Sequence, residues 1–260
     1  MGPEYDRAPA SESPRPRQTC VVCSTPRSGS GLLCRAIAGS GAFGTPLEYL
    51  NPVHRGVLTD RWGCGPDFWS YLAALHARRS PDGLFAVKIH WEQLVAARVE
   101  ARGGDADPAV WETRDELIDD LFPNPLFVRV LRMDIDAQAV SLWRASQSNV
   151  WSLAVDDAWT PDAAPVPYSF DAIDRCRRSI ETAEACWERL LSGLGAVPYL
   201  VTYEQLGSAF EQTLSSLLRH LRPDVAAEVP PPRTRRMADE WSLEVIGRFR
   251  AERAERAATS

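Results

Sequence analysis

The chain has 260 residues, 45% hydrophobic and 25% charged, which is enough for one large globular domain with a sizeable core. Its net charge of −6 argues against a protein whose main role is to coat nucleic acid. No apolar run is long enough to span a membrane, no apolar signal core opens the chain, and the six cysteines lack disulfide-framework or zinc-ribbon spacing. We therefore expect a reduced, cytoplasmic protein.

Residues 1–18 form a polar segment with several prolines, which predicts a disordered N-terminal tail. A single domain is expected over 19–260. It opens with a buried apolar strand that contains Cys20 and Cys23. Because this C-x-x-C pair lies inside a strand and not at a helix start, a redox or metal role is not expected.

The strand runs into the loop Pro26-Arg-Ser-Gly-Ser-Gly31, which an amphipathic helix follows. Such a turn presents backbone N–H groups at a helix N-terminus, where negative charge is favoured. Ser28 and Ser30 add hydroxyl donors and Arg27 adds a guanidinium, so the loop has the groups that bind a phosphate. It is not a Walker A sequence, because no lysine follows Gly29 or Gly31. An ordinary Ser/Gly-rich turn explains the loop alone equally well.

Glu48 lies in the segment 44–50, one short helix beyond this loop. It either faces the same cleft or is a solvated loop carboxylate, and the residue type alone favours the second. Residues 51–65 contain scattered Pro and Gly and are expected to be irregular, whereas residues 66–79 have helical spacing.

The run 84–91 predicts a second buried strand. Lys88 and His90 are two residues apart and so share one face of it. Together they mark a cleft, or else a strand end that reaches solvent. Residues 92–121 are expected to form helices that are interrupted at Gly103 and Gly104.

A third strand over 126–132 leads into a helix that Asp134 or Asp136 can cap. Arg132 therefore sits at the carboxyl end of a strand, the usual place for ligands in an open α/β sheet. Ser141, about two turns into the helix, adds a hydroxyl to this second anion site. Trp143, Trp151 and Trp159 follow as core residues or, alternatively, as rings for stacking.

The rest of the chain continues the alternation of helix and strand. A long helix is predicted from Ser169 to about Gly193, a strand over 197–203 and a further helix with its apolar face over 206–221. This pattern predicts an α/β fold, a P-loop-like three-layer sandwich with a central, mostly parallel sheet flanked by helices.

Past Pro223 the chain is expected to be irregular. Three arginines after a proline run, at 233, 235 and 236, suit a basic strap across a phosphate, although a solvated basic loop fits them as well. The last helix carries an apolar stripe with Leu243 and Phe249, which packs on the domain or forms a homodimer contact.

Four segments in this order resemble the PAPS-dependent sulfotransferases, and among them the trehalose sulfotransferase-like bacterial branch; PAPS is 3′-phosphoadenosine-5′-phosphosulfate. The resemblance covers about residues 20–250 and is carried by Thr25-Pro-Arg-Ser-Gly-Ser30, Gly44-Thr-Pro-Leu-Glu-Tyr49, Arg132 with Gln138-Ala-Val-Ser-Leu-Trp-Arg-Ala145, and Arg236-Met-Ala-Asp239. Two positions depart from the pattern. Gly31 stands where Ser or Thr is usual, and Met133 stands where the branch commonly has proline.

The resemblance implies sulfuryl transfer from PAPS to a hydroxyl of a carbohydrate or glycoside-like molecule, without a metal. It makes Glu48 the general base and assigns the 5′-phosphosulfate to Arg27 and its loop. It assigns the 3′-phosphate to Arg132 and Ser141, with Arg236 closing over it. The rival functions are an ATP-dependent P-loop phosphotransferase and a catalytically inactive nucleotide-binding protein.

Overall fold

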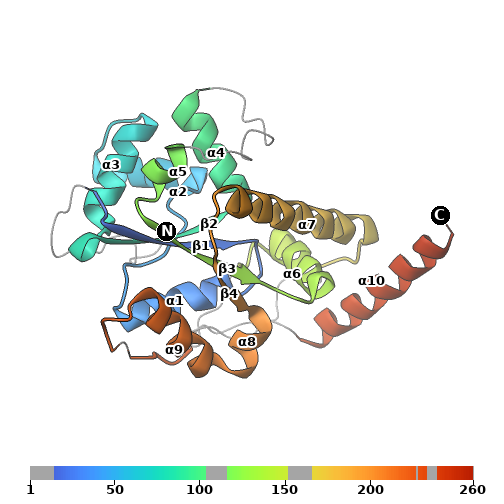
Figure 1. The fold of residues 1–260 in the computed structure, drawn as a ribbon. Helices are drawn as coiled ribbons and strands as arrows, with labels where there is room; N and C mark the ends of the chain where they lie inside the picture. The colour runs from blue at the N-terminus through green and yellow to red at the C-terminus, as the bar shows by residue number, and fades with distance from the viewer. Residues whose placement is uncertain (1–14, 104–115, 152–165, 227, 233–238, 260) are drawn as a thin grey trace.

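The computed structural model describes residues 15–103, 116–151, 166–226, 228–232 and 239–259. Within them the chain forms an α/β fold around a sheet of four parallel strands in the order β2-β1-β3-β4 (Figure 1). The strands are β1 (Gln18–Ser24), β2 (Leu84–His90), β3 (Pro125–Leu131) and β4 (Tyr199–Thr202). The expected sheet flanked by helices is confirmed, and every pairing among the described strands is parallel.

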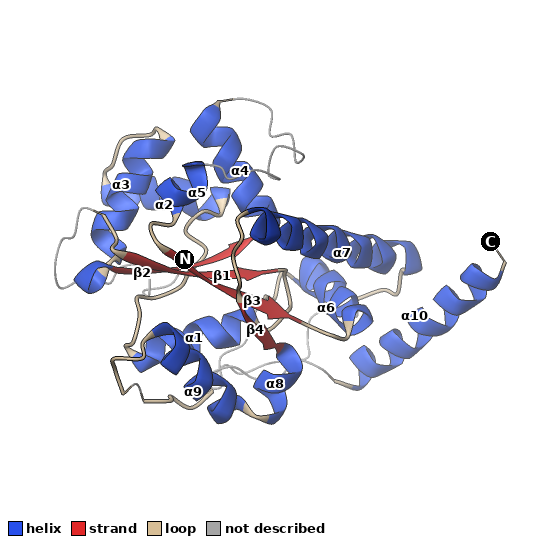
Figure 2. Cartoon of the chain, in the orientation of Figure 1, coloured by secondary structure: helices blue, strands red, loops and turns tan. Residues whose placement is uncertain are grey.

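Helices cover both faces of this sheet (Figure 2). They are α1 (Ser30–Ser40), α2 (Pro52–Trp62), α3 (Phe68–Arg79), α4 (Trp91–Arg102), α5 (Glu116–Leu121), α6 (Ile135–Ser148), α7 (Phe170–Gly193), α8 (Tyr203–Ser208), α9 (Phe210–Leu221) and α10 (Glu240–Ala258). Helices α1, α8 and α9 lie on one face, and α2 to α5 with α7 lie on the other (Figure 2).

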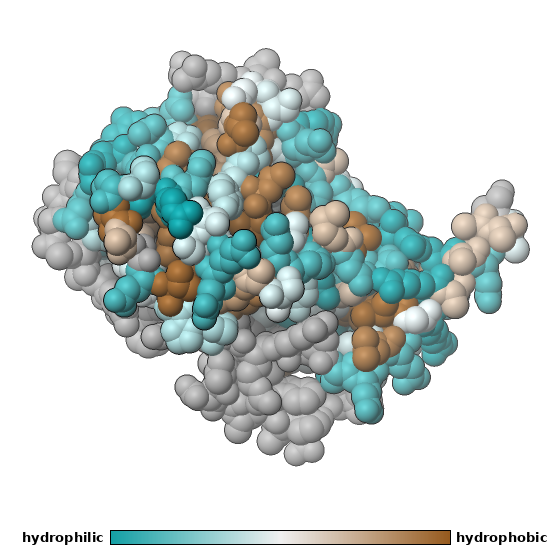
Figure 3. Space-filling model, turned by 60° about the horizontal axis from the view of Figure 1, so that its bottom comes forward, coloured by the Kyte–Doolittle hydropathy of each residue, from teal (hydrophilic) through white to brown (hydrophobic). Residues whose placement is uncertain are grey.

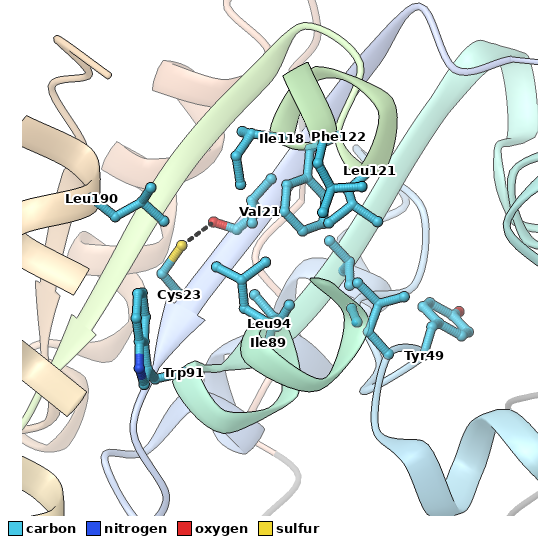
Figure 4. Packing of buried hydrophobic residues seen from close by; sticks show 14 of the residues in the cluster. Val21, Cys23, Tyr49, Ile89, Trp91, Leu94, Ile118, Leu121, Phe122 and Leu190 are labelled. Carbon is cyan, nitrogen blue, oxygen red and sulfur yellow. Dashed lines mark hydrogen bonds between the residues drawn. The ribbon is translucent and has the colours of Figure 1, made fainter. Parts of the chain in front are cut away.

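Both faces of the sheet are apolar because both are covered, as is usual for parallel strands. Val21 and Ile89 point toward α4, α5 and α7, where they join a core that includes Leu94 and Leu190 (Figure 4). On the opposite face, strand residues pack against α1, α8 and α9; this second core contains Cys20, Val22, Leu33, Ile37, Ala86, Val128, Val130, Val201, Leu206, Leu214 and Leu217.

The strand order places the site. The four carboxyl ends of the parallel strands meet at one edge, and β1 lies between β2 on one side and β3 on the other. Such a switch point leaves a crevice outside the carboxyl ends of the strands, where ligands of open α/β sheets bind. The loops that follow β1, β2 and β3 are therefore the segments that can meet a ligand together.

The segment 51–65 was predicted to be irregular, and this prediction is wrong, because residues 52–62 form α2. The Asn51 side chain caps the helix by accepting from the Val53 N–H at 3.1 Å, and Pro52 suits its first position. Only Leu58 is buried along α2, so no apolar stripe revealed the helix. The helix expected over 206–221 is also divided, into α8 and α9 at Ala209.

Cys20 and Cys23 are fully buried in β1, and burial raises the pKa of both thiols well above its usual range. Thiols with a raised pKa stay protonated at neutral pH, and in that form they are poor nucleophiles. None of the described helices combines the length and the apolar character needed to cross a membrane.

Helix α10 starts beside α6 and runs away from the body at a slant (Figure 1). In the space-filling view this end of the molecule projects from the body (Figure 3). Val245 and Phe249 are buried against α6 and α7, whereas Leu243 is 67% exposed. Ion pairs add to this contact: Arg250 binds Asp134 and Asp136 at the start of α6, at 2.5 and 3.2 Å. The alternative in which the last helix packs on the domain is therefore confirmed for these residues.

Candidate functional site

The loop between β1 and α1 has a backbone that only a few residue types accept. Arg27 and Gly29 are in the left-handed region, with φ of 65° and 89°. A Cβ atom on Gly29 would lie 2.8 Å from Cδ2 of Tyr203, so no larger residue fits there without a shift. The loop thus turns tightly into the N-terminus of α1, where the first N–H groups of a helix face a ligand.

Ser28 supplies evidence that this loop is made for a ligand. Its side chain is fully buried, and its Oγ has no hydrogen-bond partner among the described residues. A buried hydroxyl without a partner costs about 1–3 kcal/mol, which a bound anion would recover. Ser30 is also buried, while a Cβ on Gly31 would meet no atom within 4 Å.

The loop and the segment after β3 form one arrangement, which we call the arginine side: residues 25–31 with Arg132 and Ser141. Arg27 Nε donates to Ser141 Oγ at 2.9 Å, and its Nη1 donates to the carbonyl of Trp151. Arg132 Nη1 donates to the Arg27 carbonyl at 3.4 Å, and its guanidinium lies 4.4 Å from the centre of the Tyr203 ring. The two anion sites expected from the sequence are therefore in direct contact.

Like charges gather on the arginine side. The pKa of Arg27 is lowered first by burial and then by the charge of Arg132, with Arg144 adding to the effect and Tyr203 opposing it. Guanidinium groups crowded in this way favour a ligand with several negative charges.

Arg144 connects the arginine side to α10. Its Nη1 and Nη2 donate to the two carboxylate oxygens of Asp239 at 2.7 and 2.8 Å, and these hydrogen bonds lower the pKa of Asp239 to about 2. Asp239 caps α10 by accepting from the Ser242 N–H at 3.0 Å. Arg236 and the other arginines of the expected strap lie outside the described residues.

Glu48 lies next to the end of β2, where its segment runs parallel to the strand: Leu47 pairs with Val87, and Lys88 N donates to the Leu47 carbonyl at 2.9 Å. The Glu48 side chain is only 20% exposed, so it is not a solvated loop carboxylate. The clustering of Lys88 and His90 near it likewise favours the cleft over the solvent-facing strand end.

We call the cluster around this carboxylate the glutamate side. Lys88 Nζ lies 2.5 Å from Glu48 Oε1, and His90 Nε2 lies 3.7 Å from the same oxygen. Gln93 Nε2 and Asn51 Nδ2 donate to Oε2 at 2.6 and 3.2 Å. Both oxygens therefore have donors, which fixes the orientation of the carboxylate.

These partners decide the protonation states on the glutamate side. Burial alone would raise the pKa of Glu48, but Lys88 and His90 with the hydrogen bonds hold it well below its usual range. The pKa of His90 falls to about 4 because of burial and the Lys88 charge, against the opposing effects of Glu48 and the Ser24 carbonyl. At neutral pH Glu48 is thus a carboxylate and His90 a neutral imidazole.

His90 joins the two sides of the site. Its Nδ1 lies 3.0 Å from the Ser24 carbonyl, which can only accept, so Nδ1 carries the proton and Nε2 faces Glu48. Ser24 is the last residue of β1 and pairs with His90 in the sheet register. The Glu48 carboxylate and the loop after β1 therefore lie at the same edge of the sheet, and the paired residues Ser24 and His90 connect them.

Sequence reasoning missed several polar residues of the site. Asn51 and Gln93 bind Glu48, and Gln138 and Glu184 bind the underside of the loop. For Gln138 two signals were available: it begins one of the segments that resemble the family, and its spacing of three from Ser141 puts both on one helix face.

The tryptophans were left open between core and stacking roles. Trp143 Nε1 donates to the Pro167 carbonyl at 3.2 Å, so part of this ring has a structural partner. Trp151 is 49% exposed beside Arg27, and Trp159 lies outside the described residues.

A parallel sheet with an anion loop after its first strand, and a second cationic segment after its third, has the arrangement expected of a PAPS-dependent sulfotransferase. Sequence comparison agrees: the model of the family described as Stf0 sulphotransferase matches residues 19–252. The chain belongs to the Stf0 sulphotransferase family and is a PAPS-dependent sulfotransferase.

Two curated relatives are similar along nearly their whole length. A trehalose 2-sulfotransferase of Mycobacterium tuberculosis is 29% identical over 261 residues, covering 89% of this chain and 94% of the relative. A trehalose 2-sulfotransferase of Mycolicibacterium smegmatis is 24% identical over 257 residues, covering 88% and 93%. The expected resemblance to PAPS-dependent sulfotransferases, and among them to trehalose sulfotransferases, is confirmed.

Proposed function

We propose that this protein transfers a sulfuryl group from PAPS to a hydroxyl of a sugar such as trehalose, with Glu48 as the general base. The proposed acceptor class rests on the two relatives described as trehalose 2-sulfotransferases, which align with this chain over most of its length. The proposed base rests on the geometry of the glutamate side.

The arginine side would hold the donor. Ser28, Ser30 and the N–H groups at the start of α1 fit the 5′ end, and the buried Ser28 Oγ without a protein partner supports this fit. Gly29 lets the loop turn tightly against Tyr203, and Gly31 borders open space. Arg27 would neutralise charge on the bridging and phosphate oxygens.

Arg132 and Ser141, with Arg236 from beyond the described residues, would hold the 3′-phosphate. When bound, PAPS supplies an activated sulfuryl group and a phosphate leaving group.

The glutamate side would manage the proton. Glu48 is charged at neutral pH and can accept the proton of the acceptor hydroxyl. A carboxylate that is held by an ammonium at 2.5 Å is a weak base, so the ion pair with Lys88 must loosen for this step. Once protonated, Glu48 has the neutral Nε2 of His90 nearby as an acceptor, at 3.7 Å in this structure.

One observation carries the proposal: His90 contacts both the last residue of β1 and the carboxylate of Glu48. It supports the proposal that Glu48 acts as a general base beside the loop that would bind the donor, as in-line transfer to a bound hydroxyl requires. A protein that only stored a nucleotide would not need a buried, oriented carboxylate at this place.

The test is a thermal-shift comparison of 3′,5′-bisphosphoadenosine, ADP and ATP with magnesium, followed by an assay for sulfate transfer from PAPS to trehalose. The bisphosphate at about 100 times its Kd should raise Tm most, by roughly 5–10 °C. Greatest stabilisation by ATP with magnesium would favour a phosphotransferase. Bisphosphate binding without transfer to any sugar would favour an inactive nucleotide-binding protein.

A further inference from the structure

A series of hydrogen-bonded polar side chains, most of them buried, connects the loop to α6, α7 and β3. Gln138 of α6 donates from Nε2 to Thr25 Oγ1 at 2.9 Å and to the Pro26 carbonyl at 2.8 Å. Thr25 Oγ1 donates to Glu184 Oε1 of α7 at 2.7 Å, and Arg129 of β3 donates to Glu184 Oε2. Thr25, Gln138 and Arg129 are 0%, 1% and 6% exposed, and the Glu184 side chain is 23% exposed, so little water reaches the bonds next to the loop.

The direction of every bond in this series is fixed. The Pro26 carbonyl can only accept, which orients the Gln138 amide with Nε2 toward the loop. The Glu184 carboxylate accepts from both sides, so the Thr25 hydroxyl hydrogen points to Glu184 and its lone pair to Gln138. Because each of these hydrogen bonds has only one possible donor and acceptor, the series of bonds favours a single conformation of the loop.

The loop needs such a hold. Arg27 has a left-handed backbone, which costs a non-glycine residue on the order of 1 kcal/mol unless its surroundings impose it. Thr25 and Pro26, which accept the hydrogen bonds from Gln138, directly precede Arg27. The same face of α6 carries Ser141, which binds the Arg27 side chain three residues after Gln138. Helix α6 thus contacts the loop backbone and its arginine together.

We propose that Gln138, Thr25, Glu184 and Arg129 act as positioning residues that set the loop in its donor-binding conformation. This proposal rests on the proposed function, because it takes the loop to bind the phosphosulfate end of PAPS. It assigns to Thr25 an effect on donor affinity that is separate from its contribution to folding.

Two buried threonines, Thr19 near the start of β1 and Thr25 directly after its end, give a matched test. Thr19 and Thr25 are both fully buried, and Thr19 Oγ1 donates to the Pro123 carbonyl at 2.8 Å, far from the site. Thr25→Val and Thr19→Val each remove one buried hydroxyl of equal size. Thr25→Ser keeps the hydroxyl of this series and serves as the rescue variant.

Calorimetry with 3′,5′-bisphosphoadenosine, well below Tm, is the readout. Thr25→Val should weaken binding about tenfold and raise KM for PAPS while KM for the sugar stays constant, since one bond to a charged group is lost. Thr19→Val should lower Tm similarly with unchanged affinity, and Thr25→Ser should bind nearly as wild type. Should Thr25→Val not fold, Gln138→Met is measured instead, with the same expectation.

Equal bisphosphate affinity in Thr25→Val (or its substitute Gln138→Met), Thr19→Val and wild type would overturn the proposal and leave the series of polar side chains a purely structural feature. A wild-type protein that fails to bind the bisphosphate would instead overturn the proposed function. The two failures are therefore distinguishable.

Discussion

The arginine side and the glutamate side of the site differ in how their charges are balanced. On the glutamate side, Glu48 has Lys88, Gln93 and Asn51 as donors, so the carboxylate is satisfied without a ligand. On the arginine side, burial and then the neighbouring charge of Arg132 lower the pKa of Arg27, and the Ser28 hydroxyl is buried without a partner among the described residues. The glutamate side is therefore satisfied by protein donors, whereas we expect the arginine side to gain stability when an anion binds.

This difference fits their separate tasks. A general base must hold its geometry before the acceptor arrives, which a fully hydrogen-bonded carboxylate does. A site for a donor with several negative charges gains affinity from cations that repel one another until the donor is present. Changes on the glutamate side should therefore affect turnover, and changes on the arginine side should affect donor affinity.

The largest effect is expected for Glu48→Gln. Loss of the base should reduce kcat by about 10³-fold, in the range that general bases contribute. Bisphosphate binding should be unchanged, because the arginine side is intact. Steady-state kinetics and calorimetry measure the two quantities. Wild-type turnover in this variant would remove Glu48 from the mechanism.

The pH dependence of stability comes next. His90 and His76 are buried with pKa values lowered to about 4, His76 by burial against the opposing hydrogen bond to the Leu121 carbonyl. Their unfolded value is about 6.5, so the unfolded state binds more protons as the pH falls from 6.5 toward 4. The stability that these neutral histidines contribute is therefore complete above pH 6.5 and is lost progressively as the pH falls toward 4.

At pH 5.5 each of these histidines should cost about 1.4 kcal/mol of unfolding free energy relative to neutral pH. Urea unfolding at pH 7.5 and 5.5 measures the loss. His76→Gln, which removes one titrating group far from Glu48, should lose less stability between the two pH values than wild type does. An identical loss in both proteins would show that His76 is not buried as a neutral side chain.

Asp239→Asn tests the connection of the arginine side to α10. It leaves the charge of Arg144 uncompensated near Arg27 and should cost about 1 kcal/mol of stability at low salt, because the ion pair is partly exposed. Asp171→Asn, which breaks the exposed pair with Arg256 farther along α10, is the control and should cost less. Thermal unfolding at low and high salt compares the two variants. Equal losses of stability would contradict a stabilising role for the ion pair between Arg144 and Asp239.

Gly31→Ser should have the smallest effect, and unlike the other substitutions it should be favourable, because it should strengthen donor binding. The new side chain enters open space at the start of α1, and its hydroxyl adds a donor where sulfotransferases of this class commonly have one. One added hydrogen bond should tighten bisphosphate binding by about fivefold. Gly31→Ala, which changes helix propensity without adding a hydroxyl, should bind as wild type. Equal affinity of the serine and alanine variants would place position 31 outside the donor site.

The sequence predicted the parts of this molecule that local patterns encode. Apolar runs predicted the four strands, and the small residues after Cys23 predicted the tight turn into α1, because both depend on neighbouring residues. Helix α2 was not predicted because it buries only Leu58 and has no apolar stripe.

The residues that hold the site in place could not be found in this way. Glu184 contacts Thr25 across 159 positions of the sequence, and Arg27 contacts Ser141 across 114. Contacts of this kind depend on how helices pack on the sheet, for which a single sequence has no local signature. Resemblance to a family identified Glu48, whereas only the structure identified its partners Gln93 and Asn51.

The central claim is that the arginine side binds both phosphates of the donor, with Arg132 on the 3′-phosphate. Calorimetry of wild type and Arg132→Ala with 3′,5′-bisphosphoadenosine and with ADP tests it most directly. Loss of a charge-assisted contact should weaken the bisphosphate by about 10- to 100-fold and ADP far less. Equal losses for the two nucleotides would contradict the claim.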